Sequence, residues 1–415
     1  MKNRMSCWLI KSLIMLMFAF LVNSCLKDAP NNQPNVIKVG VLLGFTGSGS
    51  QNANDTKASL NIGVSEINTY LSQVGYQGTV ELYFEDTKTD TTEAKIKAQL
   101  LIDKGIKLII GPYTSAETKA VKSITDPQHV LLISHSAVST SLAIPNDYLL
   151  RFVPCDTYQA EAINAMFTSD SIKAIIPVIR NDLWSNSLIN ATALRFTQNG
   201  GEILTKQSFE PGTTDFTSLI TNVKEQITEG TNLYGSDKIA IYLISYGDGT
   251  DFLEALADAG STGNIKIYGA SAYAQSASLT GSNKAASFAI ASNLQCPVFG
   301  FDETAAHIYE PLLDKIELIT GTRASIYALA AYDILWNMAL TTITHDSNIG
   351  PEAFKTAFIE MAASYSGATG SARLDENGDR MNVYYDFWSV GIENSNYVWQ
   401  LSAKYNTTNH LLTKN

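Results

Sequence analysis

Residues 107–118, Lys-Leu-Ile-Ile-Gly-Pro-Tyr-Thr-Ser-Ala-Glu-Thr, combine a short apolar run, a turn and the start of a helix. The apolar run 108–110 predicts a buried strand, and Gly111-Pro112 ends it. Thr114 or Ser115 can cap the helix that follows, because a side-chain oxygen there accepts hydrogen bonds from the first N–H groups. In open α/β sheets, ligands bind at such strand-to-helix junctions. The stretch therefore has two interpretations: an ordinary helix cap, or a site where a hydroxyl and backbone N–H groups hold an oxygen.

Short β-rich runs alternate with helical periodicity on both sides of this stretch, which is typical of a parallel sheet covered by helices. The first set of expected strands lies at residues 37–43, 79–84, 108–111 and 130–134. The pattern then restarts, with strands expected at residues 172–179, 202–204, 239–245 and 265–269. Three more helices and two β-rich segments are expected at residues 304–316, 325–340, 351–363, 381–390 and 397–403.

This repetition predicts an α/β fold of two doubly wound, Rossmann-like lobes joined by a multi-strand hinge. A chain of 415 residues also exceeds one ordinary hydrophobic core. We assign residues 36–153 and 298–382 to the first lobe, and residues 154–297 and 383–409 to the second. A chain that crosses several times between two lobes permits hinge closure over a ligand.

The amino terminus has the pattern of an export signal. Residues 1–24 place basic side chains ahead of the apolar run 13–22, which is too short for a confident membrane span. The run ends in Val-Asn-Ser-Cys, which resembles a bacterial lipobox and predicts a lipid on Cys25. Residues 25–35 would form a tether, and the protein would lie in the cell envelope, anchored to a membrane and facing the periplasm or the exterior. A cleaved, soluble secreted protein is the alternative.

Charge and cysteine content limit the partners. The formal net charge is −11, and without residues 1–24 it becomes −14, from 26 basic and 40 acidic residues. Nucleic-acid binding relies on basic surfaces, so we expect no nucleic-acid partner. With Cys7 in the signal and Cys25 lipid-modified, Cys155 and Cys296 remain, and one pair in an exported protein suggests one disulfide.

Several segments resemble the type I periplasmic binding proteins, in particular the branch that binds branched-chain amino acids and amides, in its lipoprotein form. They match the family's opening strand, ligand loop and first helix, its second strand, its two first-lobe ligand turns and its return segment: residues 37–47 with 58–68, 85–94, 111–115, 133–137 and 367–386. The resemblance covers residues 36–403. It implies a small-molecule ligand, an ABC transporter permease as partner, no cofactor and no enzymatic step.

The resemblance also implies ligand-binding residues in both lobes. They are Gln51, Thr114, Ser115, Ser136, Ala137 and Ser139 in the first lobe and Trp184, Tyr246 and Ser271 in the second. Ser115 falls where the family's hydroxyl meets the ligand carboxylate, and Ser136 lies in the adjacent turn. The next hydroxyl position is Val138 here, so that contact is lost or moves to Ser139.

In the second lobe, Trp184 falls where the family presents an aromatic wall and Tyr246 where it presents a tyrosine. Aromatic walls bury ligand surface and attract an ammonium by cation–π interaction worth about 0.5–2 kcal/mol. Packing between the lobes is the alternative role for Trp184.

One departure from the family concerns the ligand's amino group. The family's amino-acid binders carry a carboxylate after the strand 265–269, whereas this chain has Ser271 there. A buried ammonium without a partner is costly. Either an acid such as Asp182 or Asp248 supplies the charge, or the ligand is a carboxylic acid, an amide or another small polar molecule.

Several other features bear on disulfide formation, metal binding or catalysis. Cys155 and Cys296 lie near expected lobe crossings, which suggests a disulfide across the hinge. His135 lies in a ligand turn, where it either binds ligand or is solvated. The acidic segment 375–379 lacks the twelve-residue calcium-loop pattern and is better interpreted as a turn. No dinucleotide, P-loop or nucleophile-elbow motif is present.

The sequence therefore predicts a lipid-anchored solute-binding protein that captures an amino acid, amide or carboxylate for ABC-type transport. The competing hypothesis is an envelope lipoprotein or sensor domain of the same fold that acts through protein contacts. An exported hydrolase is disfavoured, since no catalytic triad is apparent.

Overall fold

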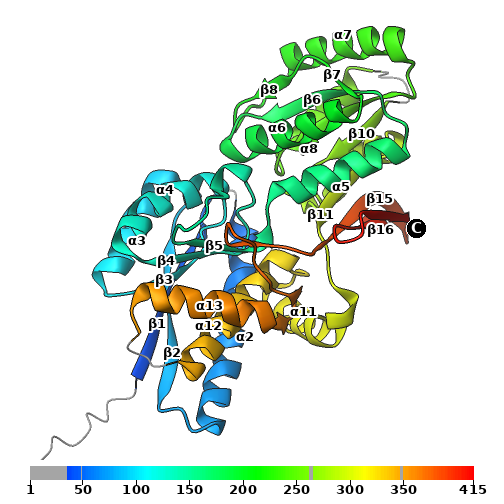
Figure 1. Cartoon of the computed structure of the whole chain (residues 1–415). Helices are drawn as coiled ribbons and strands as arrows, with labels where there is room; N and C mark the ends of the chain where they lie inside the picture. The colour runs from blue at the N-terminus through cyan, green and yellow to red at the C-terminus, as the bar shows by residue number, and fades with distance from the viewer. Residues whose placement is uncertain (1–34, 48, 261–264, 346–348) are drawn as a thin grey trace, which may run out of the picture.

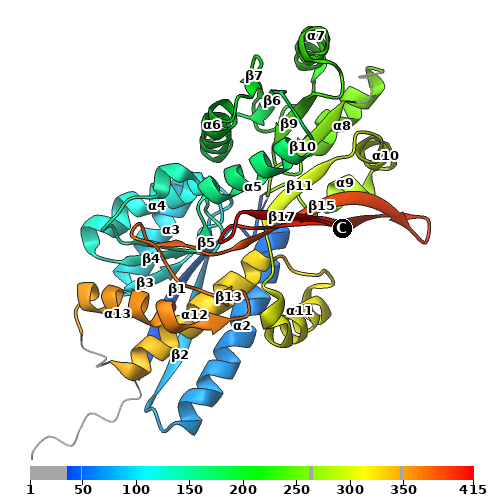
Figure 2. The same cartoon turned by 45° about the vertical axis from the view of Figure 1, so that its right-hand side comes forward.

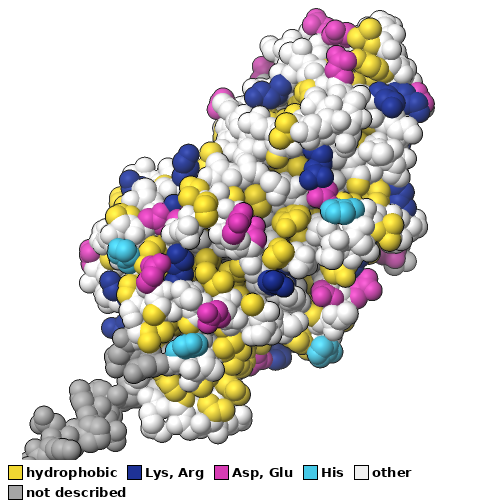
Figure 3. All heavy atoms as spheres, viewed as in Figure 1, with side chains coloured by type: hydrophobic (Ala, Val, Ile, Leu, Met, Phe, Trp, Pro, Cys, Tyr) yellow, Lys and Arg dark blue, Asp and Glu magenta, His cyan; other side chains and the backbone are white. Residues whose placement is uncertain are grey.

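The computed structural model describes residues 35–47, 49–260, 265–345 and 349–415. Two large sheets form two lobes, which confirms the expected α/β fold class (Figure 1). The expected signal sequence, Cys25 and nearly all of the tether lie outside the described residues. On the face of the described residues seen in Figure 3, basic side chains are dispersed among acidic ones rather than gathered into one stripe.

The sheet of the first lobe has six parallel strands in the order β14-β5-β4-β3-β1-β2. The strands are β1 (Asn35–Leu43), β2 (Gly78–Asp86), β3 (Leu108–Ile110), β4 (Leu131–Ser134), β5 (Leu149–Pro154) and β14 (Asp379–Arg380). The helices of this lobe are α2 (Ser50–Gln73), α3 (Thr91–Asp103), α4 (Ser115–Thr125), α11 (Ala306–Thr320), α12 (Ile326–Thr344) and α13 (Pro351–Ser364). A hairpin of β12 (Ser366–Gly367) and β13 (Gly370–Ser371) follows α13.

Alternating side chains of β1 explain how this sheet is covered. Val39, Val41 and Leu43 belong to the core shared with α2 and α12, whereas Leu42 belongs to the core shared with α3 and α4. Successive residues of a strand face opposite sides, so one apolar run serves both cores. The carboxyl ends of the strands point toward the second lobe (Figure 1). A ligand site is expected at this end of a parallel sheet.

The second lobe has a mixed sheet in the order β17-β16-β15-β11-β10-β9-β6-β7, with β8 also paired to β6. The strands are β6 (Ala174–Arg180), β7 (Glu202–Ile203), β8 (Gln207–Phe209), β9 (Ile239–Ile244), β10 (Lys266–Gly269), β11 (Gln295–Phe299), β15 (Tyr384–Glu393), β16 (Asn396–Asn406) and β17 (Leu411–Lys414). The helices are α5 (Asp156–Ser169), α6 (Leu183–Gln198), α7 (Thr217–Tyr234), α8 (Gly249–Asp258), α9 (Ala277–Gly281) and α10 (Asn283–Ala291). Helices α5 and α6 share one core with this sheet, and α7, α8 and α10 share the other.

Three chain segments cross between the lobes, as Figures 1 and 2 show. They join β5 to α5, β11 to α11, and β14 to β15. Strands β11 and β15 are antiparallel neighbours, with Pro297 opposite Phe387. The crossings lie next to one another, since Asp379 pairs with Arg151 and Phe299 with Tyr385, so the lobes can rotate about them as about a hinge.

Helix α12 is the one described helix that is long and apolar enough to cross a membrane by length and composition. Its position in the fold gives a different explanation, because 83% of its apolar window is buried inside the protein. It packs against α2 and α13, so it is a core helix of the first lobe.

Candidate functional site

A cleft of about 920 Å³ lies between the lobes and is lined from both. Six candidate residues line it: Gln51, Thr114, Ser115, Trp184, Tyr246 and Ser271. A recess of about 20 Å³ shares Ser115, Trp184 and Tyr246 with the cleft and adds Ser136 and Val138. The structure thus brings together seven of the nine candidate residues. Ala137 and Ser139 line neither cavity and are buried.

The turn before Ser115 needs a glycine. Gly111 has a φ of +99°, and a Cβ at this position would lie 2.2 Å from the carbonyl oxygen of Leu42. The chain then enters α4 through a capping box, in which Thr114 Oγ1 accepts from the Glu117 N–H at 3.2 Å and the Thr114 N–H donates to Glu117 Oε2 at 3.1 Å. Thr114 therefore caps the helix, which confirms the first interpretation, and Ser115 lines the cleft, where its role toward a ligand stays a prediction.

Ser115 is held by the neighbouring turn. Its Oγ accepts a hydrogen bond from the Ser139 N–H at 3.2 Å, and no other hydrogen bond of this oxygen occurs among the described residues. The Ser115 proton can therefore be donated to a ligand oxygen. Ser136, by contrast, already donates its hydroxyl proton to the Tyr113 carbonyl at 2.7 Å, so its contact with a ligand would be through lone pairs or backbone.

A buried ion pair supports this turn. Arg151 donates from Nη1 to the carbonyls of Ser139, at 2.8 Å, and Ala137, at 3.3 Å. The same guanidinium makes a bidentate pair with Asp379 of β14, and both side chains are almost completely buried. Ala137 and Ser139 therefore lie in a structural network behind the cleft, where the structure differs from the expectation that they contact ligand directly.

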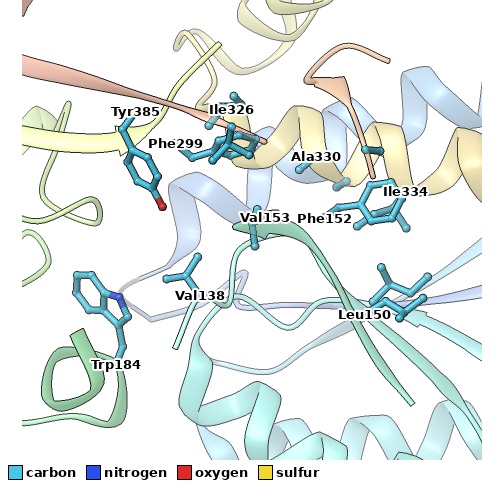
Figure 4. Packing of buried hydrophobic residues seen from close by; sticks show 14 of the residues in the cluster. Val138, Leu150, Phe152, Val153, Trp184, Phe299, Ile326, Ala330, Ile334 and Tyr385 are labelled. Carbon is cyan, nitrogen blue, oxygen red and sulfur yellow. The ribbon is translucent and has the colours of Figure 1, made fainter. Parts of the chain in front are cut away.

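The second-lobe wall of the cleft is aromatic. The rings of Trp184 and Tyr246 lie 5.0 Å apart between centroids, and the Arg180 guanidinium lies 4.8 Å from the Tyr246 centroid. Trp184 is only 3% exposed and packs in the core near Val138 and Tyr385, so it both lines the cleft and packs between lobes (Figure 4). Burial raises the pKa of Tyr246 well above its usual range, so its phenol stays a neutral hydrogen-bond donor.

The two acids considered as partners for a ligand ammonium are already paired. Asp182 and Asp248 each place a carboxylate oxygen 3.5 Å from Nε of Arg180. Asp182 also caps α6 by accepting from the Ser185 N–H at 2.8 Å. Ser271 lines the cleft where the family's carboxylate was expected, and the acid of the described second-lobe wall, Asp182, shares the single Arg180 guanidinium with Asp248.

Several cleft residues were not found from the sequence. Arg180, Tyr113, Asn52, Asp55 and Tyr327 all line the cleft or hold its lining in place. Tyr113 lies inside the stretch 107–118, so its position beside Ser115 was a usable signal. Asp55 stands one helical turn after Gln51, which also pointed to the same helix face. Tyr327 comes from α12, far away in sequence, and no local pattern identifies it.

Two buried titratable groups lie near the cleft. His135 is completely buried, and neither ring nitrogen has a hydrogen-bond partner among the described residues, so the expectation of a solvated histidine is wrong. Burial lowers the pKa of His135 to about 4. Asp156, the first residue of α5 at the hinge, is also completely buried, and burial raises the pKa of its carboxyl well above its usual range despite nearby Arg151.

The proposed hinge disulfide is contradicted. Cys155 and Cys296 are both free thiols in the structure, and both are buried. Cys155 precedes α5, whereas Cys296 lies in β11 with its sulfur facing Gly269 of the neighbouring strand; a Cβ at Gly269 would come within 2.3 Å of it. Cys296 thus packs inside the second-lobe core rather than toward the crossing that holds Cys155.

The acidic segment 375–379 forms a turn. Asp375 Oδ1 accepts from the N–H groups of Asn377, at 2.8 Å, and Asp379, at 3.0 Å, which confirms the turn interpretation. Among the described residues, no three His, Cys, Asp or Glu side chains group closely enough to hold a metal ion.

Two α/β lobes, three crossings and a cleft lined from both sides define a ligand-binding protein of the type I periplasmic binding fold. The chain belongs to the receptor family ligand binding region, whose model matches residues 56–393. This match confirms the resemblance to the type I periplasmic binding proteins, and the lipoprotein form stays a prediction.

Individual relatives agree on the fold. An uncharacterized protein of Methanocaldococcus jannaschii is 25% identical over 401 residues, which cover 91% of each chain. The crystal structure of a leucine binding protein from Thermotoga maritima matches with a TM-score of 0.72 at 19% identity, covering 90% of this chain and 99% of that one. A solute binding protein of an ABC transporter from R. palustris, solved with benzoate, matches with a TM-score of 0.67 at 14% identity, covering 88% and 96%.

Proposed function

We propose that the protein is an extracytoplasmic solute-binding protein that captures a small polar ligand between its lobes and delivers it to an ABC-type transporter. The observation that carries this proposal is the interlobe cleft, with the Ser115 hydroxyl on one wall and Trp184 and Tyr246 on the other. The family membership supports it. So do the fold relatives named for leucine and benzoate, which differ in their ligands and leave amino acids, amides and carboxylates as the candidate classes.

The walls would act in sequence. In the open protein, Ser115 and the amino end of α4 hold the ligand's carboxylate or carbonyl oxygen, since free N–H groups and a hydroxyl favour that end. Trp184 and Tyr246 then cover the ligand as the lobes rotate about the crossings. The fraction of closed protein follows from the ligand's higher affinity for the closed state, and no bond of the ligand is broken.

A thermal-shift panel tests this function. Amino acids, amides, short carboxylates and aromatic acids are added singly, and a ligand at a hundred times its Kd should stabilise the protein by about 2.7 kcal/mol. Ser115→Ala should reduce the shift. Ser123→Ala, which removes an exposed hydroxyl of the same helix bonded only to the Ala120 carbonyl, should leave it unchanged. A panel without any shift would instead favour the role through protein contacts.

We further propose that Cys25 carries the lipid that holds the protein in the cell envelope. The support is the sequence pattern of residues 13–25, an apolar run that ends in Val-Asn-Ser-Cys. Metabolic labelling with a radioactive fatty acid should mark the wild-type protein and not Cys25→Ala. Equal labelling of both proteins would contradict the anchor.

A further inference from the structure

The charged residues that line the cleft are mostly neutralised by one another. They are Asp55, Asp182, Glu310, Arg180 and Arg323. Arg180 lies 3.5 Å from Asp182, and Arg323 contacts Glu310 as well as Asp314, at 2.9 Å. Asp55 differs, because no lysine, arginine or histidine among the described residues lies within ion-pair distance of its carboxylate.

Asp55 is instead held by neutral donors. Gln51 Nε2 donates to Asp55 Oδ1 at 3.1 Å, and Thr322 Oγ1 donates to the same oxygen at 3.2 Å. The Thr320 hydroxyl also favours the charged form of this carboxyl through a side-chain hydrogen bond. The side chain is largely buried, with 4% of the residue exposed, and burial raises the pKa of Asp55 in spite of these hydrogen bonds. A carboxylate withdrawn from water without a counter-charge gains free energy when a cation binds to it.

The position of Asp55 relative to Ser115 limits the shape of such a ligand. Asn52 of α2 donates to the Tyr113 hydroxyl at 3.1 Å, so the whole Tyr113 side chain spans the space between the Ser115 turn and α2. Asp55 lies three residues farther along α2, about 4.5 Å along the helix axis. The contact with Thr322 places it beside the end of α11, which packs against α2 (Figure 2).

We propose that Asp55 binds a cationic amino group of the ligand, and that this group sits on a different carbon from the carboxylate or carbonyl held by Ser115. The ligand class is therefore an amino-carboxylate or amino-amide with separated ends, rather than an α-amino acid, whose two charged groups share one carbon. This inference rests on the proposed solute-binding function. It also accounts for Ser271, because a cation held by the first lobe needs no acid on the second.

Calorimetric titration of matched probes tests the inference on the full chain. The probes are 6-aminohexanoate, hexanoate and leucine, and the proteins are wild type, Asp55→Asn, Thr322→Val and Asp258→Asn. Asp55→Asn keeps the oxygen that accepts from Gln51 and Thr322 and removes the charge. Thr322→Val keeps the charge and removes one hydrogen bond. Asp258→Asn is the matched control, an exposed acid of α8 paired with Lys284.

Wild type should bind 6-aminohexanoate at least about tenfold more tightly than hexanoate, because hexanoate has no amino group to make a charge-assisted hydrogen bond with Asp55. The preference should disappear in Asp55→Asn, with hexanoate affinity unchanged, and should persist in Thr322→Val and Asp258→Asn. An equal preference in Asp55→Asn, tighter binding of hexanoate or leucine, or no binding of the aminated probe would overturn the assignment of Asp55. If hexanoate or leucine still binds in a Ser115-dependent way, the solute-binding function stands; if no small molecule of the wider panel binds, both proposals fail.

Discussion

The two walls of the cleft are built for different tasks. The first-lobe wall presents the Ser115 hydroxyl, the start of α4 and the Asp55 carboxylate, which has no cationic partner among the described residues, and buried or part-buried hydrogen bonds hold these groups. The second-lobe wall presents Trp184 and Tyr246, and its acid, Asp182, shares the Arg180 guanidinium with Asp248. Polar recognition therefore resides on the first lobe, and the second lobe contributes apolar closure.

The difference extends to what lies behind each wall. Behind the first wall, the Arg151–Asp379 pair ties the Ser139 turn to the return strand β14, so this wall is fixed in shape before a ligand arrives. The second wall meets the first through two hydrogen bonds, from the Thr140 N–H at 2.9 Å and between the Thr140 and Ser187 hydroxyls at 2.6 Å. Both contacts are part-buried and involve the Ser187 hydroxyl, which can exchange them for water as the lobes move.

Removing one partner of the buried ion pair should have the largest effect. Arg151→Met leaves the Asp379 carboxylate buried without a partner and should lower the free energy of unfolding by about 3–5 kcal/mol. The double variant Arg151→Met/Asp379→Leu should be less destabilised than Arg151→Met alone, because no charge is stranded. Urea denaturation measures both. Lys284→Met, at an exposed pair, should lower the free energy of unfolding by less than about 1 kcal/mol. An equally small loss for Arg151→Met would show that the buried ion pair does not hold the first wall in shape.

Acid should weaken the first lobe through His135. Its folded pKa of about 4 lies below the ordinary value of 6.5, so between these values the unfolded chain binds the proton and the folded protein does not. Stability should therefore fall as the pH drops through this window, by up to about 3 kcal/mol. His135→Leu should lose this slope. The raised pKa of Asp156 makes stability rise as the pH drops. Because Asp156 is present in both proteins, this contribution is the same in both and does not affect their difference. An identical slope in the variant would show that His135 is not the titrating group.

Ser115→Ala should weaken the best ligand of the panel by about tenfold, because a donor to a charged oxygen contributes roughly 1.5 kcal/mol or more. Calorimetry measures the change in Kd. Stability should fall only slightly, since the Ser139 N–H loses one acceptor at 3.2 Å. An unchanged Kd would show that Ser115 does not bind the ligand and that another residue holds its oxygen.

Tyr246→Phe should have the smallest effect. It keeps the ring beside Trp184 and under Arg180 and removes only the hydroxyl, so Kd should change by less than about threefold. Titration of the same ligand provides the measurement. A loss as large as that of Ser115→Ala would mean that the second wall also recognises polar groups, and the contrast between the walls would have to be redrawn.

Local patterns predicted much of this arrangement. Short apolar runs such as 108–110 are buried on both faces of a parallel sheet, and helices of regular periodicity cover them, so most strands appeared where expected. Strand β11 was missed, because Pro297 in a five-residue strand argues against a central position. Its neighbour β15 runs antiparallel to it, with Phe387 opposite Pro297.

The sequence placed at the cleft those residues whose position depends only on neighbouring parts of the chain. Ser115 and Trp184 follow strands directly, so their positions at the cleft could be inferred from the fold. Asp55 was missed because a polar residue in a helix ordinarily faces water, and its burial depends on the loop at Thr322, more than 250 residues away. Ser139 was misjudged because the buried Arg151 that holds it cannot be paired with Asp379 from sequence alone.

Small-angle X-ray scattering measures directly whether a ligand bound to the first wall causes the lobes to close. The radius of gyration is measured for wild type and Ser115→Ala, with and without the strongest ligand of the panel at the same concentration, set near the wild-type saturation point. Ligand should lower the radius of gyration of wild type and lower that of Ser115→Ala much less. An unchanged wild-type radius at saturating ligand would contradict closure of the lobes over a bound solute.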